Sequence, residues 1–455
     1  MEIVPERRGW RSGGGHGMKS ANDHPEIERF LDAVCRQVRA KTLHVQIKEE
    51  LATHLQELVE ENRAGGMNEA EAVHAAVSRM GEPARIGREL DRAHRPRTDW
   101  ILIAFIAGLT ALGLLALYNF QMQGSGPARY VNFFEKKTIF TGIGALLMVV
   151  FWVIDYEKIK KLSGYLFGSG VLLLIGVHEF GHSMNGQTAW FEIGPFGIYA
   201  PIVSILLFVV GLAGIKPLRE QDWKGGLLLI AYRGIMPVLL LLKVNVVTMA
   251  VLYALVFIVY LGLTKKHAWQ VVAYTSSGVL LVVWTLLNSH YGFMRAFGFL
   301  NRFDDPGGGD YMVTQSLNAM QSAGWWGNGD SNVRIPSVQA EGFLPYFISY
   351  FGWAAGILLI AVILGFIVKT VKSAASVRDD YGKLLFAGIA SFFAIQYAWG
   401  IAMVFGFAPF VGISLPFLSY GGTDQIVQFA AIGLVLGIYR RRDMVAVSKP
   451  AQRNK

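Results

Sequence analysis

The chain has 455 residues, of which 53% are hydrophobic and only 16% are charged, and its mean hydropathy is +0.38. This composition excludes a soluble protein of this size and indicates a membrane protein with several spans. The net charge of +9 does not indicate a nucleic-acid binder, because Lys and Arg gather in the N-terminal region and in short loops between apolar runs, as orientation in a membrane requires.

The N-terminal region predicts a disordered tail and a small helical domain. Residues 1–23 are rich in Gly and charge and show no periodicity. Over 24–97, apolar residues recur at helical spacing, as in Ile27, Phe30, Leu31 and Val34. Asn68, with Glu71 three residues on, is a candidate helix start. We expect a cytoplasmic helical bundle with Cys35, the single cysteine, packed inside it.

Ten apolar segments follow, each of the length that the hydrocarbon core of a bilayer requires. They cover residues 100–119, 137–155, 164–180, 198–215, 225–241, 246–264, 268–287, 345–370, 383–406 and 424–439. We therefore predict an all-α polytopic membrane domain over 98–442, with a short cytoplasmic tail over 443–455. The first segment is expected to act as the insertion signal, since no cleavable signal peptide precedes it.

The charges of the loops predict the topology. Lys and Arg concentrate in the loops on one side and in the N-terminal region, whereas the loop 181–197 has neither. By the positive-inside rule, both termini are cytoplasmic and the large loop 288–345, between the seventh and eighth spans, is extracytoplasmic. This loop holds Arg295, Arg302 and Arg334, where topology does not need a positive charge. A ligand is one explanation for them, and a solvated loop surface is the other.

One short motif indicates a metal site. His178, Glu179 and His182 fit H-E-x-x-H, which is similar to the zinc motif of intramembrane site-two proteases. On a helix, the two His would share a face and bind zinc, with the Glu as general base. The later Asp ligand that those proteases need is missing from the sequence, so polar residues at a helix end are the simpler interpretation.

A glycine-containing turn precedes the last span. Ser419, Tyr420, Gly421, Gly422 and Thr423 enter a helix there. Two glycines at a helix start allow a tight turn, whose free backbone amides could receive an anionic group.

Two long stretches carry a family resemblance. The first is PFVGISLPFLSYGGTDQIVQFAAIGLVLGI, with matching residues at Pro409, Gly412, Leu415, Pro416, Phe417 and Ser419 to Thr423. The second lies in the large loop, with matches at Arg295, Asn301, Tyr311, Gln315, Ser316, Ala319, Ser322, Gly324 and Gly327. Both resemble the SEDS family, the FtsW/RodA/SpoVE proteins of cell-wall synthesis. Separately, the segment NEAEAVHAAVSRMGEPARIGREL resembles the HAAS or permease-prefix type of domain, which implies regulation or docking.

The SEDS resemblance implies a peptidoglycan glycosyltransferase. Family members polymerise lipid II at the outer face of the cytoplasmic membrane, each with a class B penicillin-binding transpeptidase, in cell-wall synthesis, cell shape or division. No cofactor is implied with certainty, apart from a divalent cation that could accompany the pyrophosphate. A non-catalytic SEDS-fold regulator or binder of lipid-linked precursors is the first alternative, and the intramembrane zinc protease is the second.

The resemblance also implies the site residues. Glu341 stands where the family has the Asp of L-P-E-x-H-T-D-F, so it becomes the candidate base, and Arg295 becomes the candidate contact for the pyrophosphate or the donor. The substrate-binding candidates are Arg295, Asn301, Tyr311, Gln315, Ser316, Lys243, Ser419, Tyr420, Gly421, Gly422 and Thr423. The family's Arg is replaced at Ala189, its His at Gln339, and its Q-P-D-L-G-T begins here with Lys243. These departures leave two readings open: a divergent polymerase that uses Glu341, Arg295 and Lys243, or a member that has lost catalysis and kept the fold.

Overall fold

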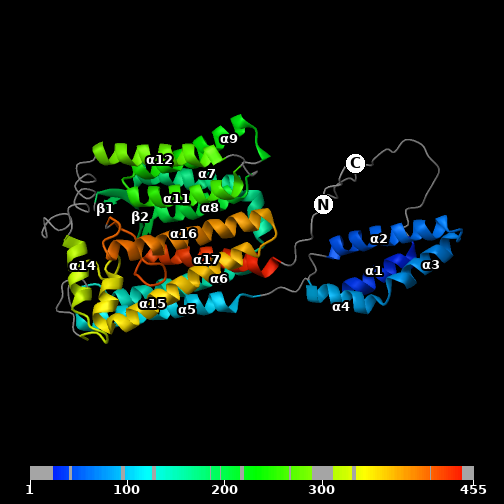
Figure 1. Cartoon of the computed structure of the whole chain (residues 1–455), viewed down its shortest axis with the longest axis horizontal. Coiled ribbons are helices and arrows are strands. Elements are labelled where there is room, and N and C mark those ends of the chain that lie inside the picture. The colour runs from blue at the N-terminus through cyan, green and yellow to red at the C-terminus, as the bar shows by residue number, and fades with distance from the viewer. Residues whose placement is uncertain are drawn as a thin grey trace. The chain divides into compact units, whose positions relative to one another are not determined.

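The computed structural model describes residues 24–39, 44–93, 98–124, 130–184, 186–194, 196–215, 220–265, 268–288, 311–329, 335–409 and 411–442. The chain forms two compact units, of which the second runs from Arg97 to Arg442 (Figure 1). The predicted disordered tail over 1–23 and the tail over 443–455 lie outside the described residues. The predicted domain boundaries, and the cytoplasmic placement of the first unit, stay predictions.

The first unit is a bundle of four helices. They are α1 (Pro25–Gln37), α2 (His44–Ala64), α3 (Glu69–Met80) and α4 (Pro83–Ala93). The apolar residues of α1 that repeat at helical spacing are all buried in its core, because that spacing puts them on one face. The side chain of Asn68 caps α3 by accepting the Glu71 N–H at 2.9 Å, so the predicted helix start is confirmed. Cys35 is buried in the same core.

The second unit is built mainly from helices. They are α5 (Trp100–Gln123), α6 (Phe133–Val153), α7 (Tyr156–Phe180), α8 (Ala200–Ala213), α9 (Trp223–Leu229), α10 (Met236–Lys243), α11 (Val247–Thr264), α12 (Ala268–Asn288), α14 (Tyr311–Gln321), α15 (Phe343–Ala375), α16 (Asp380–Val404) and α17 (Gly422–Arg441), with a π-helical turn, η5 (Ile230–Ile235), between α9 and α10. Among the described residues, eight helical runs are long and apolar enough to cross a membrane. The polytopic helical fold is therefore as predicted.

The ten predicted spans all coincide with helices, although their ends differ. Eight correspond to the long apolar runs, and the other two correspond to α8, which has 14 residues, and α12, which has 21; the count of ten stays a prediction. The third helix begins at Tyr156, ahead of the predicted 164, because Asp155 caps it by accepting the Glu157 N–H at 3.0 Å. Local capping thus extends the helix through a polar segment that the hydropathy pattern leaves out.

The second unit also contains a small β-sheet. Three short strands lie between α7 and α8, namely β1 (His182–Met184), β2 (Gln187–Ile193) and β3 (Phe196–Tyr199), and they form an antiparallel sheet in the order β1-β2-β3. Trp190 is paired with Tyr199 across β2 and β3, and their ring centroids are 4.7 Å apart. The sheet connects directly to α8 through Tyr199.

The core of the second unit is organised around α17. Its side chains from Val427 to Ile438 are buried without interruption, and it packs against α6, α8 and α16. Figure 1 shows it between α6 and α16. Because the helix is enclosed, the turn that enters it at Gly422 is also held inside the unit.

Candidate functional site

Two turns meet at the start of α15 and α17. The backbone N–H of Tyr420 donates to the Gln339 carbonyl oxygen at 2.7 Å, and the Ser419 hydroxyl donates to the Ala340 carbonyl oxygen at 2.8 Å. Both bonds reach the residues immediately ahead of Glu341. The structure therefore joins the turn around Ser419 to the backbone ahead of Glu341 and fixes the backbone position of the candidate base.

The Glu341 carboxylate lies close to the backbone of Gly412, in the segment that leads to α17. A Cβ atom on Gly412 would lie 3.3 Å from Glu341 Oε1, so the carboxylate approaches the backbone closely at that point. The side chain of Glu341 is half-buried. The next residue, Gly342, has no space for a side chain, because a Cβ there would lie 2.3 Å from the Pro336 carbonyl oxygen. This tight packing restricts where Glu341 can point.

The turn around Ser419 satisfies its own polar groups. Ser419 is buried. Its side-chain oxygen accepts the Leu415 N–H at 3.1 Å, and its hydroxyl donates to the Ala340 carbonyl oxygen. Phe417 adopts a positive φ of 62°, and its N–H donates to the Gln428 side chain at 3.0 Å. The hydrogen-bonding capacity of Ser419 is thus used within the protein, which supports a structural role in shaping the site.

A buried lysine holds this turn, and the sequence analysis missed it. Lys137 on α6 is 0% exposed, and its Nζ donates to the carbonyl oxygens of Phe417, Leu418 and Ser419 at 2.9, 2.6 and 2.9 Å. All three ammonium protons are therefore used, as a buried charge requires. In the sequence, Lys137 is the first residue of the predicted span 137–155. A lysine at that place is ordinarily interpreted as marking the end of a membrane helix near the lipid headgroups.

The start of α17 is tied to the sheet and carries an acid. The Thr423 hydroxyl donates to the Gly197 carbonyl at 3.2 Å and its oxygen accepts the Tyr199 N–H at 3.1 Å. The next residue is Asp424, whose Oδ2 would lie 2.9 Å from a Cβ on Gly421. Asp424 places a carboxylate at this helix start, and the expectation that the backbone amides there receive an anionic group stays a prediction. The sequence analysis also missed Asp424.

The other predicted substrate residues lie on α14, at the end of α10, or outside the described residues. Tyr311 is 40% exposed at the first position of α14, and Gln315 is half-buried on the same helix. Ser316 is buried and donates to the Met312 carbonyl at 2.7 Å. Lys243 is exposed at the end of α10, a helix that packs against α7 and α11. Arg295 and Asn301, like Arg302 and Arg334, lie outside the described residues.

The H-E-x-x-H interpretation was wrong in its geometry. Helix α7 ends at Phe180, so His182 belongs to β1 and does not share a helix face with His178. The nearest acid of each His differs: His178 lies 3.9 Å from Glu179, and His182 lies 4.0 Å from Glu192. Within the described ranges, no group of three or more His, Cys, Asp or Glu side chains could hold a metal ion.

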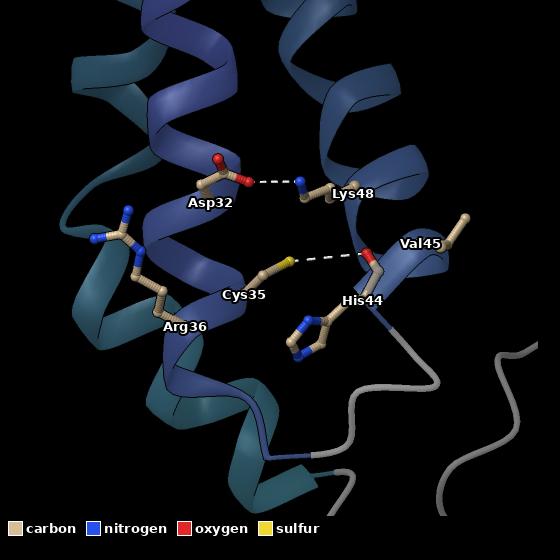
Figure 2. A pocket seen from close by; sticks show the side chains of 6 residues that line it. All are labelled: Asp32, Cys35, Arg36, His44, Val45 and Lys48. Carbon is tan, nitrogen blue, oxygen red and sulfur yellow. Dashed lines mark hydrogen bonds and ion pairs between the residues drawn. The ribbon is translucent and has the colours of Figure 1, made fainter.

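The first unit has a pocket of its own. Its volume is about 400 Å³, and Asp32, Cys35, Arg36, His44, Val45 and Lys48 line it. Figure 2 shows Lys48 paired with Asp32, and Cys35 directed at the carbonyl oxygen of His44. The hydrogen bond from Lys48 lowers the pKa of Asp32, and burial raises the pKa of the Cys35 thiol. The ring of His44 is hydrogen-bonded to the Val38 carbonyl oxygen at 2.8 Å.

The comparison with known proteins decides the family. Residues 99–444 match the family model of FtsW, RodA and SpoVE, described as a cell cycle protein. The chain belongs to this family. A relative from Thioalkalivibrio sp. (strain K90mix), named probable peptidoglycan glycosyltransferase FtsW, is 31% identical over 77% of this chain and 92% of its own length. The peptidoglycan glycosyltransferase RodA of Treponema pallidum (strain Nichols) is 24% identical over 76% of this chain and 98% of its own length.

Solved structures share the fold. One, described as "Structural coordination of polymerization and crosslinking by a peptidoglycan synthase complex", superimposes with a TM-score of 0.64 at 23% identity over 76% of this chain and 98% of its own. The crystal structure of the Thermus thermophilus rod shape determining protein RodA gives a TM-score of 0.58 at 20% identity over 76% of this chain and 97% of its own. Family and apolar helices together identify an integral protein of the inner membrane.

Proposed function

We propose that this FtsW/RodA/SpoVE family member is a peptidoglycan glycosyltransferase that polymerises lipid II at the outer face of the cytoplasmic membrane. The observation that carries the proposal is the position of Glu341, which two hydrogen bonds connect to the family's Ser419–Tyr420 turn. The names of its curated relatives support the same activity. In this topology both termini are cytoplasmic, and the first unit serves docking or regulation.

The chemistry assigned to Glu341 is general-base catalysis. Its carboxylate accepts the proton of the acceptor sugar hydroxyl as that oxygen bonds to the anomeric carbon of the donor, and the bond from that carbon to the pyrophosphate breaks. Undecaprenyl pyrophosphate leaves with the electron pair, with Arg295 as its proposed contact. Asn301, Tyr311 and Gln315 are the proposed sugar contacts. Glu differs from the family's Asp by one methylene, which moves the carboxylate oxygens by about an ångström.

The proposed partner is a class B penicillin-binding transpeptidase. The solved peptidoglycan synthase complex, whose description couples polymerisation with crosslinking, supports such an assembly. The proposal expects no zinc requirement. Whether a divalent cation accompanies the pyrophosphate is tested separately, by adding or omitting that cation in the polymerisation assay.

The test is polymerisation of labelled lipid II by the purified protein, with and without a class B transpeptidase. Glu341→Gln should abolish the glycan ladder, because the amide does not accept the proton. The matched control is Glu192→Gln, which changes an exposed acid on β2 and should leave the ladder intact. A ladder from Glu341→Gln would overturn the base assignment.

The non-catalytic alternative rests on one observation in the structure. Ala189, where the family has an Arg, is fully buried within β2, so no cation can project from that position. If the folded wild-type protein with its partner makes no product, the chain is a regulator or precursor binder, and equilibrium binding of lipid II distinguishes those two. Stoichiometric binding of zinc through His178 and His182 would instead favour the protease.

A further inference from the structure

One cation lies near the middle of a membrane span, and the proposed glycosyl transfer does not use it. Arg233 lies ten residues from either end of the span Trp223–Lys243. At about 1.5 Å per residue, that is about 15 Å from each end, the middle of a hydrocarbon core about 30 Å thick. A charged side chain at that depth is costly, and it therefore indicates a function.

The backbone around Arg233 departs from an ordinary α-helix. The span makes the π-helical turn η5 there, a form that is frequent at functional sites. On α11, the Tyr253 hydroxyl donates to the carbonyl oxygen of Arg233. On α12, the Tyr274 hydroxyl donates to the carbonyl oxygen of Gly234 at 3.3 Å. Because two neighbouring helices bind this turn, the backbone that carries the Arg233 side chain is held in place.

The guanidinium of Arg233 lies beside aromatic rings and has no anion. It is 3.8 Å from the centroid of the Phe167 ring on α7 and 5.4 Å from that of Tyr232. Its Nη1 atom is buried and has no hydrogen-bond partner among the residues that the structure describes. The titratable groups that act on its charge are Tyr232, Tyr253 and Tyr260, which are neutral at physiological pH. Aromatic rings attract a cation, but they leave its charge uncompensated.

The surface near Arg233 has room for another helix. Tyr232, directly before Arg233, is exposed. On α7, Gly164 and Gly168 lie three residues before and one residue after Phe167, and a Cβ on either glycine would meet nothing within 4 Å. Two glycines at this spacing let a neighbouring membrane helix approach closely. We call η5 and the part of α7 from Gly164 to Gly168 the Arg233 surface.

We propose that the Arg233 surface docks a transmembrane helix of another protein, and that this helix carries an Asp or Glu near its midpoint that pairs with Arg233. An Arg–carboxylate pair would supply the hydrogen-bond acceptor that Nη1 lacks. A second copy of this chain does not fit, because in the described helices the acids of the spans, such as Glu135, Glu179 and Asp424, lie near helix ends.

The depth of Arg233 decides between a protein and a lipid as the source of the anion. Lipid phosphates lie outside the hydrocarbon core, about 15 Å from this position. A carboxylate at the midpoint of a neighbouring span lies at the same depth as the guanidinium. The charge and its depth therefore both fit an acidic membrane helix.

The test measures how labelled polyleucine helices of membrane-spanning length bind the full-length protein, by energy transfer in phosphatidylcholine vesicles. One helix carries Asp at its midpoint, the second carries Asn there, and the third carries Asp six residues nearer to one end. The midpoint Asp helix should bind about tenfold more tightly than the Asn helix. The displaced Asp should lose this preference, because it lies about 9 Å away along the helix.

Variants assign the preference to the guanidinium. In Arg233→Gln the difference between the Asp and Asn helices should disappear, whereas Arg233→Lys, which keeps the charge, should retain part of it. The matched control is Lys224→Gln, which removes an exposed cation at the start of the same span and should retain all of it.

Three results would overturn the proposal. The first is equal binding of the midpoint Asp and Asn helices by the wild-type protein, and the second is a preference for Asp that survives in Arg233→Gln. The third is loss of the preference in phosphatidylglycerol vesicles, which would identify a lipid anion as the ligand. If Arg233→Gln does not fold, the wild-type protein decides, because equal binding of the midpoint and displaced Asp helices also refutes pairing at this depth.

Discussion

Replacing Lys137 with Met tests whether one buried ammonium holds the turn before α17. Methionine has a similar length and no donor, so the carbonyl groups of Phe417, Leu418 and Ser419 lose the partner that binds them at 2.6–2.9 Å. Each buried carbonyl left unpaired costs about 1 kcal/mol or more, which sums to about 3 kcal/mol as a lower bound.

The assay is thermal unfolding in lipid nanodiscs, combined with lipid II polymerisation. Lys137→Met should lower the unfolding midpoint by several degrees and reduce polymerisation, because the turn also carries the contacts to the backbone ahead of Glu341. The matched control is Lys136→Met, which removes the neighbouring exposed lysine and should change neither readout. Lys137→Arg should also destabilise the protein, because Gly113 leaves little room; a Cβ there would lie 2.9 Å from Lys137 Nζ.

The reasoning would be refuted if Lys137→Met were as stable and as active as Lys136→Met. That result would mean that the turn keeps its shape through its own bonds, such as those of Ser419 and Phe417. Equal stability of Lys137→Arg and wild type would show that the packing around Gly113 is looser than the structure indicates.

Three further changes test the frame around the site, each by thermal unfolding or labelling. Gly352→Ala should cost about 1–3 kcal/mol from its φ of 88°, and more from a clash with the backbone of Trp325 and Gly327 after α14. Gly142→Ala, with open space around it, should be neutral or stabilising. Asp99→Asn should cost less than the about 3–5 kcal/mol of a fully buried pair, because its partner Lys369 is 23% exposed; no loss would contradict a structural ion pair. Maleimide should label Cys35 slowly at neutral pH and faster on unfolding, since burial raises its thiol pKa; rapid labelling of the folded protein would contradict this.

The sequence by itself determined the class of protein, most helices and the family. Long apolar runs predict membrane helices because a bilayer requires a fixed length and internal backbone hydrogen bonds. Helical spacing in α1 and the Asn68 cap were equally readable, since each depends on residues within one or two turns. The position of Glu341 followed from its place in a motif. All of these signals are local in the chain.

Only the tertiary structure decided what surrounds Glu341. Lys137 and the carbonyl of Leu418 are 281 residues apart in sequence, and no local pattern connects them. The same holds for the hydrogen bond from the Ser419 hydroxyl to the Ala340 carbonyl oxygen, which joins residues 79 apart in sequence. The H-E-x-x-H motif misled because the pattern assumes that one helix carries both His residues. In the structure α7 ends at Phe180, before the second His. Side chains acquire their role from the neighbours that folding brings to them, and those neighbours lie beyond the range of any motif.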